Sequence, residues 1–135
     1  WNLYEYPSGR PVPQAARDVL EIRRVLAASL IRSPAHPGLC HLGIHFYEMG
    51  PNPSESLSIC SVLRERFPDA GHLIHMSTHI DLLLGDYSSC VKYSINAIQG
   101  DEKIWRSFPQ TSGFGSYHIA YLAHNFHMLI YGALM

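Results

Sequence analysis

Charged residues are scarce in this sequence. They make up 16% of its 135 residues, whereas hydrophobic residues reach 47%; an ordinary soluble domain is about a quarter charged. The formal net charge is −1, and the ten Lys and Arg residues are scattered along the chain. Proteins that bind nucleic acid or anionic membranes need a basic surface, so both classes of partner are excluded. The scarcity of charge also predicts that other protein covers part of the surface.

Cysteine motifs are absent as well. Cys40, Cys60 and Cys90 are an odd number at wide spacings, with no CxxC pair and no disulfide pattern. This predicts a reduced, intracellular environment, either cytoplasmic or organellar. The chain starts at Trp1 without an initiator Met and stops at Met135 within an apolar run. We therefore expect an internal piece of a longer protein, and no targeting signal is visible in it.

The C-terminal stretch 107–135 contains no Asp, Glu, Lys or Arg. A membrane-spanning helix would have such a composition, but helix-breaking and polar residues interrupt this stretch, and lipid disfavours them. They are Pro109, Gly113, Gly115, His118, His124, Asn125 and His127. A membrane span is therefore not expected. The stretch is instead predicted to pack against the remainder of its own chain, and other protein subunits are expected partners.

The distribution of hydrophobic residues predicts an all-α fold. No segment alternates apolar and polar residues for long enough to form a strand. Proline, glycine and capping residues instead divide the chain into helices. The predicted parts are an irregular entry at 1–12, a helix at 13–34, a helical hairpin at 37–67, a second hairpin at 70–99, a loop-rich linker at 101–116 and a helix of a further repeat at 117–135.

Local signals predict the helix boundaries within the two hairpins. Asn52 and Asp69 are candidate N-caps for the helices that follow them. Gly85 predicts a helix end, and Asp86 predicts the start of the next helix. Gly100 predicts the end of the second hairpin.

The two hairpins repeat each other in sequence. His41 and His45 recur as His75 and His79, an offset of 34 residues. A period of 34 with two antiparallel helices in each unit is the spacing of tetratricopeptide (TPR) repeats. The segment 85–98 also has a helix-ending glycine, aromatic residues and small residues in the order of such a repeat. The pattern therefore predicts TPR-like antiparallel helical hairpins.

Three histidine-containing strings carry a narrower resemblance. They are HPGxxHxxxHxxE at 36–48, PDAGHLxHMxxHI at 68–80 and HNxH at 124–127. With them the chain resembles a histidine-rich family of TPR-domain proteins, whose members are much longer. The resemblance implies that the hairpins stack as a right-handed superhelix, and it implies no particular activity. Ser77 and Asp81 stand where the resemblance leads us to expect a proline and an aromatic residue.

Histidine is present in excess, with nine copies. Most of these side chains recur three or four residues apart, which places them within about 60° of one another on one face of a helix. Two imidazoles at such a spacing can bind one metal ion. The candidate metal ligands, including one carboxylate, are His41, His45, Glu48, His72, His75, His79, His124 and His127.

We expect these groups to converge in one groove. In a repeat stack, the first helices of successive hairpins are neighbours and line the concave face. The surrounding segments carry few fixed charges, which favours neutral imidazole, the form that binds metal. Nitrogen ligands with one carboxylate suit zinc, iron or copper. His36 and His118 are expected to make ordinary hydrogen bonds, and Asp81 is expected to face solvent because it lies opposite His79 on its helix.

Two functions fit these observations. The first is a TPR-like helical-repeat protein with a histidine-rich transition-metal site on its concave face, which is a metalloenzyme if the ion is catalytic. The alternative is a structural or adaptor TPR subunit that mediates protein–protein contacts in a larger assembly and catalyses nothing. No glycine-rich phosphate loop and no nucleophile elbow occur in the sequence, so catalytic residues and substrate are not indicated.

Overall fold

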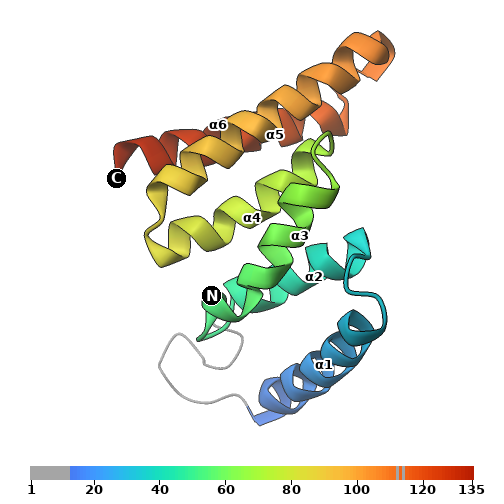
Figure 1. Cartoon of the computed structure of the whole chain (residues 1–135), viewed down its shortest axis with the longest axis vertical. Helices are drawn as coiled ribbons and strands as arrows, with labels where there is room; N and C mark the ends of the chain where they lie inside the picture. The colour runs from blue at the N-terminus through green and yellow to red at the C-terminus, as the bar shows by residue number, and fades with distance from the viewer. Residues whose placement is uncertain (1–12, 112, 114) are drawn as a thin grey trace.

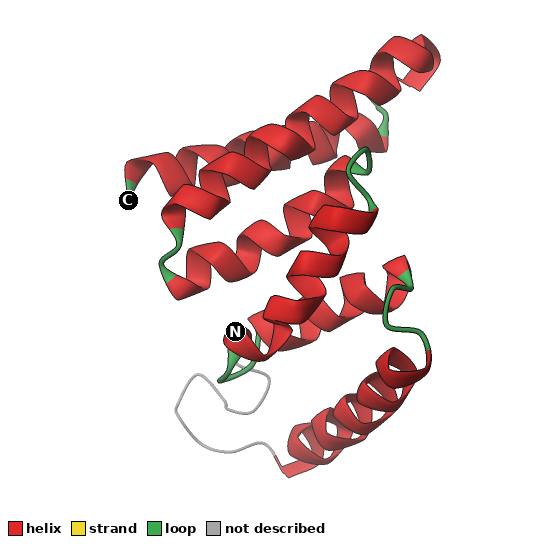
Figure 2. Cartoon of the chain, in the orientation of Figure 1, coloured by secondary structure: helices red, strands yellow, loops and turns green. Residues whose placement is uncertain are grey.

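The computed structural model describes residues 13–111, 113 and 115–135, so the irregular entry predicted at 1–12 lies outside the described residues. No strand occurs in the described part of the chain, which confirms the all-α prediction (Figure 2). Within that part, no helix is both long enough and apolar enough to cross a membrane. The helices are α1 (Pro13–Arg32), α2 (Pro37–Glu48), α3 (Leu57–Arg66), α4 (Gly71–Leu84), α5 (Tyr87–Ser107) and α6 (Tyr117–Leu134), with short 3-10 helices at Pro53–Ser56 (η1) and Pro109–Thr111 (η2).

The helices are layered from α1 at one end to α5 and α6 at the other (Figure 1). Within this arrangement α2 packs on α4, and α4 packs on α6. The helices that carry the histidines therefore form one row, as expected for the first helices of successive hairpins. α3 and α5 pack against α4 as well, whereas α1 packs on α2. The row is observed, and the TPR superhelix itself stays a prediction.

Several helix ends follow from local chemistry. His36 caps α2, because its Nδ1 accepts a hydrogen bond of 3.3 Å from the backbone N–H of Leu39. Gly85 ends α4 with a φ of 76°, a left-handed conformation that glycine adopts without strain. Asp86 then caps α5 by accepting a hydrogen bond of 3.1 Å from the N–H of Ser89. The predictions made for Gly85 and Asp86 are confirmed.

The two other predicted caps have mixed outcomes. Asn52 is the N-cap residue of the 3-10 helix η1, which precedes α3, but its side chain makes no capping hydrogen bond. The prediction for Asp69 is wrong. The residue that precedes α4 as its N-cap is Ala70, again without a side-chain bond. The carboxylate of Asp69 is instead paired with the ammonium group of Lys103 on α5. A contact from another helix thus replaces the local one that the sequence suggested.

The predicted linker at 101–116 is also wrong over its first part, because α5 continues through Gly100 to Ser107. Gly100 serves helix packing rather than helix termination. A Cβ at this position would lie 3.1 Å from the backbone nitrogen of Gly71, so glycine lets α5 lie directly against the start of α4. This contact fixes how α4, the central helix of the histidine row, sits on α5.

The hydrophobic core lies between α2, α3 and α4. It consists of Cys40, Ile44, Ile59, Cys60, Leu63, Met76 and Ile80, and a smaller cluster of Val19, Leu26 and Phe46 holds α1 on α2. The three cysteines are buried free thiols. Burial raises the pKa of the Cys60 thiol to about 11, so it is protonated and unreactive at neutral pH.

Asp81 does not face solvent as expected. Its side chain is 3% exposed, and Oδ2 accepts a hydrogen bond of 2.6 Å from Arg64 of α3. Arg64 also donates from Nε to Ser77 Oγ at 2.9 Å, and its guanidinium lies 3.9 Å from the ring centroid of Tyr93. Arg64 therefore contacts both Ser77 and Asp81, and it connects α3 to α4 and α5.

Candidate metal centre

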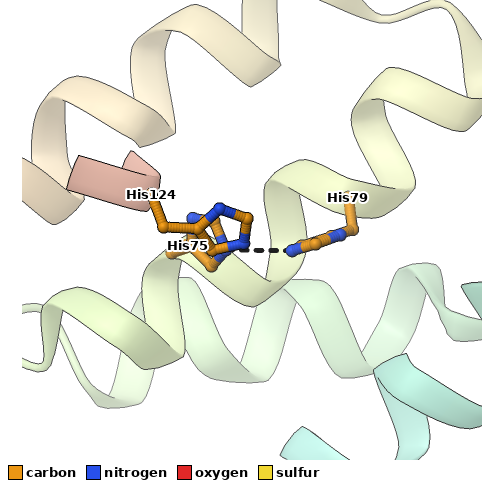
Figure 3. Close-up of side chains that lie close together, drawn as sticks. All are labelled: His75, His79 and His124. Atoms are coloured by element: carbon orange, nitrogen blue, oxygen red, sulfur yellow. Dashed lines mark hydrogen bonds between the residues drawn. The ribbon is translucent and has the colours of Figure 1, made fainter. Parts of the chain in front are cut away.

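Three histidines meet between α4 and α6 (Figure 3). Each of His75, His79 and His124 offers one ring nitrogen, and these atoms lie within 4.8 Å of one another. The Nε2 atoms of His75 and His79 are 2.9 Å apart, and the ring centroid of His124 lies 4.4 Å from that of His75. Ligand nitrogens around a tetrahedral zinc ion are separated by roughly 3.3 Å, as Zn–N bonds of about 2.0 Å require. The three side chains are therefore close enough to bind one metal ion.

The fold brings the three side chains together from two helices. His75 and His79 lie one turn apart on α4 and thus share a face. His124 comes from α6, which is held in place by its neighbour in sequence, Asn125. The Asn125 side chain is 1% exposed, and its Nδ2 donates a hydrogen bond of 2.7 Å to Asp101 Oδ2 of α5. A buried polar contact next to His124 thereby sets the position of the third imidazole.

Glu48 of α2 lies behind His79 rather than among the three nitrogens. Its Oε2 accepts a hydrogen bond of 2.8 Å from His79 Nδ1, and its Oε1 accepts one of 2.6 Å from His45 Nδ1. A carboxylate can only accept, so His79 carries its proton on Nδ1 and directs a lone pair from Nε2 toward His75. Carboxylates orient metal-binding histidines in this way in many metalloproteins. The structure thus gives Glu48 an orienting position, whereas the sequence suggested a ligand.

Burial lowers the pKa of several imidazoles in this group, those of His75 and His72 most strongly. His75 is 1% exposed, and burial together with the neighbouring His79 and His124 lowers its pKa to about 2. Burial and the adjacent His41 lower the pKa of His72 to about 4. Burial raises the pKa of Glu48, but hydrogen bonds from His79 and His45 outweigh it, so the net shift is downward. At neutral pH His75 and His72 are therefore neutral, the form of imidazole that binds metal, and the Glu48 carboxyl is ionised.

Six buried side-chain atoms have no hydrogen-bond partner among the described residues, and two of them are imidazole nitrogens of this cluster. These two are Nδ1 of His72 and Nδ1 of His75. Because His79 Nε2 is an acceptor, His75 Nε2 carries the proton of their hydrogen bond and Nδ1 holds a lone pair. Leaving a buried polar atom unpaired costs about 1–3 kcal/mol, so such atoms are rare unless a ligand uses them.

Of the remaining predicted metal ligands, His41, His45 and His72 lie beside the three clustered histidines. His41 Nε2 lies 3.1 Å from His72 Nε2, and the His41 ring is 4.7 Å from that of His45. The His72 ring also contacts Tyr121 at 4.2 Å, a contact that the sequence did not predict. His127 lies further out: within the described part of the chain, its one ring contact is with Tyr131, at 6.5 Å. Burial, His79 and His127 together lower the pKa of His124. The place of His127 in the shared groove therefore stays a prediction.

The two histidines expected to lie outside the cluster do so. His36 is the cap of α2, and its exposed position is on the surface rather than in the core. His118 lies near Asp101, whose pKa burial raises to about 6, while the positive charge of His118 acts in the opposite direction. Neither side chain faces the three clustered imidazoles.

Comparison with known proteins adds no family to this description. No family model matches the chain, and neither the curated proteins nor the solved structures contain a match. The resemblance to histidine-rich TPR proteins therefore stays a prediction. Any functional assignment has to follow from the histidine cluster itself.

Proposed function

We propose that this chain is a TPR-like helical-repeat protein that binds a transition-metal ion through His75, His79 and His124. The observation that carries the proposal is the approach of three ring nitrogens to within 4.8 Å of one another. Two further facts support it: His79 is oriented by the Glu48 carboxylate at 2.8 Å, and the buried Nδ1 of His75 has no partner among the described residues. A ligand bound at that nitrogen would satisfy it.

The donor set narrows the class of metal. Three imidazoles favour zinc, copper or iron over magnesium and calcium, which prefer oxygen ligands. Three protein ligands also leave one coordination position free, an arrangement found at catalytic zinc sites, where water occupies the fourth position. The bound ion would then act as a Lewis acid on that water, which makes hydrolysis the simplest reaction class for this site.

Metal titration tests the proposal. Adding Co²⁺ to the metal-free chain should produce the visible absorption of a nitrogen-bound ion, and Zn²⁺ should displace it. The double variant His79→Asn/His124→Asn should lose the signal, because it removes two of the three nitrogens. His118→Asn is the matched control and should bind as the unmodified protein does. An unchanged titration in a double variant that keeps its helical circular dichroism would contradict the proposal.

The adaptor function stays the alternative. It is supported by the apolar residues that α6 exposes, among them Tyr117 at 82%, Tyr131 at 57% and Leu134 at 77%. Surfaces of this kind are typical of contacts between proteins. A chain that folds with native helicity but binds neither Co²⁺ nor Zn²⁺ would favour this alternative over the metal site.

A further inference from the structure

We propose that the groove holds a second transition-metal site, formed by His41, His45 and His72, directly beside the first. This inference rests on the proposed function and extends it: the chain would bind two ions. The occupant is a divalent ion of the same chemical class, zinc or copper, because the donors are again three imidazole nitrogens.

The second group repeats the construction of the first. In the first site, α4 supplies a pair one turn apart, and α6 supplies the third imidazole. In the second, α2 supplies the pair His41 and His45, and α4 supplies His72. The pair of α2 precedes that of α4 by 34 residues, so each hairpin brings its own copy. Since α2, α4 and α6 pack in one row, each copy meets a histidine of the next helix in the row.

The distances within the two groups correspond. His41 and His45 have ring centroids 4.7 Å apart, and His75 and His79 have theirs 4.8 Å apart. The closest nitrogens of the second group, Nε2 of His41 and Nε2 of His72, lie 3.1 Å apart and join two helices, whereas those of the first group lie 2.9 Å apart on α4 alone. The second group is looser in one respect, because only the first brings three nitrogens within 4.8 Å of one another among the described residues. His45 is the residue held by Glu48, and its side chain is 41% exposed.

Glu48 connects the two groups through its two oxygens. Oε1 accepts from His45 Nδ1 at 2.6 Å, and Oε2 accepts from His79 Nδ1 at 2.8 Å. One histidine of each group thereby presents its Nε2 lone pair away from the carboxylate. The hydrogen bond from ring Nδ1 to Glu48 that orients His79 is thus also present at His45.

The buried nitrogen of His72 is the independent sign of a ligand. Its Nε2 faces another imidazole, and its Nδ1 is buried without a partner among the described residues. In a neutral imidazole one nitrogen carries the proton and the other a lone pair, so either tautomer leaves Nδ1 unsatisfied. The contact with His41 therefore uses only Nε2 of His72 and leaves Nδ1 open to a ligand.

The two groups adjoin each other. The rings of His72 and His75 are stacked with centroids 5.7 Å apart, and the rings of His45 and His79 are 6.5 Å apart. Ions bound in both groups would therefore be neighbours. Paired metal ions are a common device for hydrolysing phosphate esters and peptides, because one ion holds the substrate while the other activates water.

The experiment counts bound ions in matched variants of the 135-residue chain. Native mass spectrometry with Zn²⁺ should give two ions for the unmodified protein. His41→Asn/His72→Asn should retain one ion, and His79→Asn/His124→Asn should retain one. His118→Asn should bind two. With Cu²⁺, electron paramagnetic resonance should show magnetic coupling between neighbouring ions in the unmodified protein and none in either double variant.

The outcomes separate this inference from the proposed function. One ion bound by the unmodified protein and kept by His41→Asn/His72→Asn would overturn the second site and leave the first intact. A single ion bound by the unmodified protein and absent from both double variants would show one shared site and would also overturn the second site. Two ions kept by His41→Asn/His72→Asn would place the second ion elsewhere. No ion at all would overturn both proposals. If His41→Asn/His72→Asn fails to fold, the single variant His45→Asn tests the second site instead, because His45 is half-exposed. We expect its affinity for the more weakly bound Zn²⁺ ion to fall at least ~10-fold.

Discussion

Glu48 Oε2 and His79 Nδ1 form a hydrogen bond of 2.8 Å that crosses from α2 to α4. The bond fixes the tautomer of His79 and turns its Nε2 toward His75, 2.9 Å away. A ligand that is held in its binding orientation before the metal arrives loses less conformational entropy on binding. This contact between two hairpins therefore determines how well the first site is organised.

Replacing this carboxylate should weaken metal binding. Glu48→Gln keeps the size of the side chain, but its amide offers one acceptor oxygen and places an NH₂ group against an imidazole N–H. Removing a group that hydrogen-bonds to a metal-binding histidine typically reduces metal affinity by about 10–100-fold, and we expect a loss of that size in a chelator competition assay with Zn²⁺. Glu55→Gln is the control, because Glu55 pairs with Arg23 on the surface, with side chains 37% and 51% exposed. Equal affinities in both variants would show that Glu48 does not orient the site.

The buried histidines should make the metal-free protein sensitive to acid. Folding lowers the pKa of His75 to about 2 and that of His72 to about 4, from an ordinary value of 6.5. The unfolded chain then binds these protons more tightly, so the stabilising contribution is full above pH 6.5 and is lost as the pH falls toward 4 and below. Each pKa unit corresponds to about 1.4 kcal/mol, and we expect a loss of several kcal/mol in urea unfolding with a chelator present.

A variant identifies the group responsible for this acid sensitivity. His72→Gln should flatten the decline in unfolding free energy between pH 6.5 and pH 4, because it removes one of the two titrating rings. His127→Gln should leave the decline unchanged, since His127 is exposed and lies further out. An identical slope in all three proteins would mean that other groups cause the acid sensitivity.

Asp101 should change the pH dependence of the unfolding free energy in the opposite direction. Burial raises its pKa from 3.8 to about 6, only partly offset by His118 and by the hydrogen bond from Asn125. Its contribution to stability is therefore full below pH 3.8 and is lost as the pH rises through 6. Asp101→Asn keeps an acceptor for Asn125 and removes the charge. The start of α4 lies against this carboxylate and favours negative charge, so we expect a gain of only about 1–2 kcal/mol at pH 7.

The gain for Asp101→Asn should vanish at pH 4, where the native carboxyl is already protonated. Urea unfolding at both pH values measures this difference. Asp69→Asn is the control, since Asp69 is exposed and paired with Lys103 on the surface. Destabilisation of Asp101→Asn at pH 7 would instead indicate that the ionised carboxylate is needed there.

The structural features that were predicted correctly depend on residues that are close together in the sequence. Gly85 and Asp86 were sufficient to place the end of α4 and the start of α5, because a left-handed glycine and a capping carboxylate act within one turn. The faces on which the histidines lie also follow from helical spacing alone. Even the pairing of α2 with α4 was indicated by the 34-residue offset.

The errors at Asp81 and Gly100 involve contacts between residues far apart in the sequence. Asp81 lies opposite His79 and was expected in solvent, but Arg64 of α3 covers it. Gly100 was expected to end a helix, but it makes room for the backbone of α4. Glu48 shares a helical face with His45, and nothing in the spacing shows that its second oxygen would bind His79 from another helix. Helical periodicity gives the direction of a side chain and does not give its partner across an interface.

The pair of Arg64 and Asp81 yields a prediction on stability. Their side chains are 15% and 3% exposed, and removing one partner of a buried pair leaves the other charge without compensation. Arg64→Met should lower the free energy of unfolding by about 3–5 kcal/mol in urea titrations. Replacing both groups, as Arg64→Met/Asp81→Leu, should recover much of that loss. Arg23→Met, which breaks the exposed pair with Glu55, should cost less than about 1 kcal/mol. A small effect of Arg64→Met would indicate that Asp81 is protonated in the folded protein.

The contact of α4 with α5 leads to the last prediction. A Cβ at residue 71 would lie 2.6 Å from the backbone oxygen of Ala97 and would also collide with Oδ1 of Asp101. A backbone carbonyl cannot rotate away as a side chain can, so Gly71→Ala should push the start of α4 off α5. We expect a loss of at least about 3 kcal/mol in urea unfolding, at the upper end of the effects of overpacking.

Metal binding should report the same displacement independently of stability. α4 carries His75 and His79, whereas α5 holds α6, and with it His124, through the bond between Asp101 and Asn125. Moving α4 relative to α5 therefore separates the nitrogens of the first site, and Gly71→Ala should bind Co²⁺ at least ~10-fold more weakly while still folded. Gly113→Ala is the control, because nothing lies within 4 Å of a Cβ there. A Gly71→Ala protein that unfolds more easily but binds Co²⁺ normally would show that the positions of the three histidines do not depend on this contact.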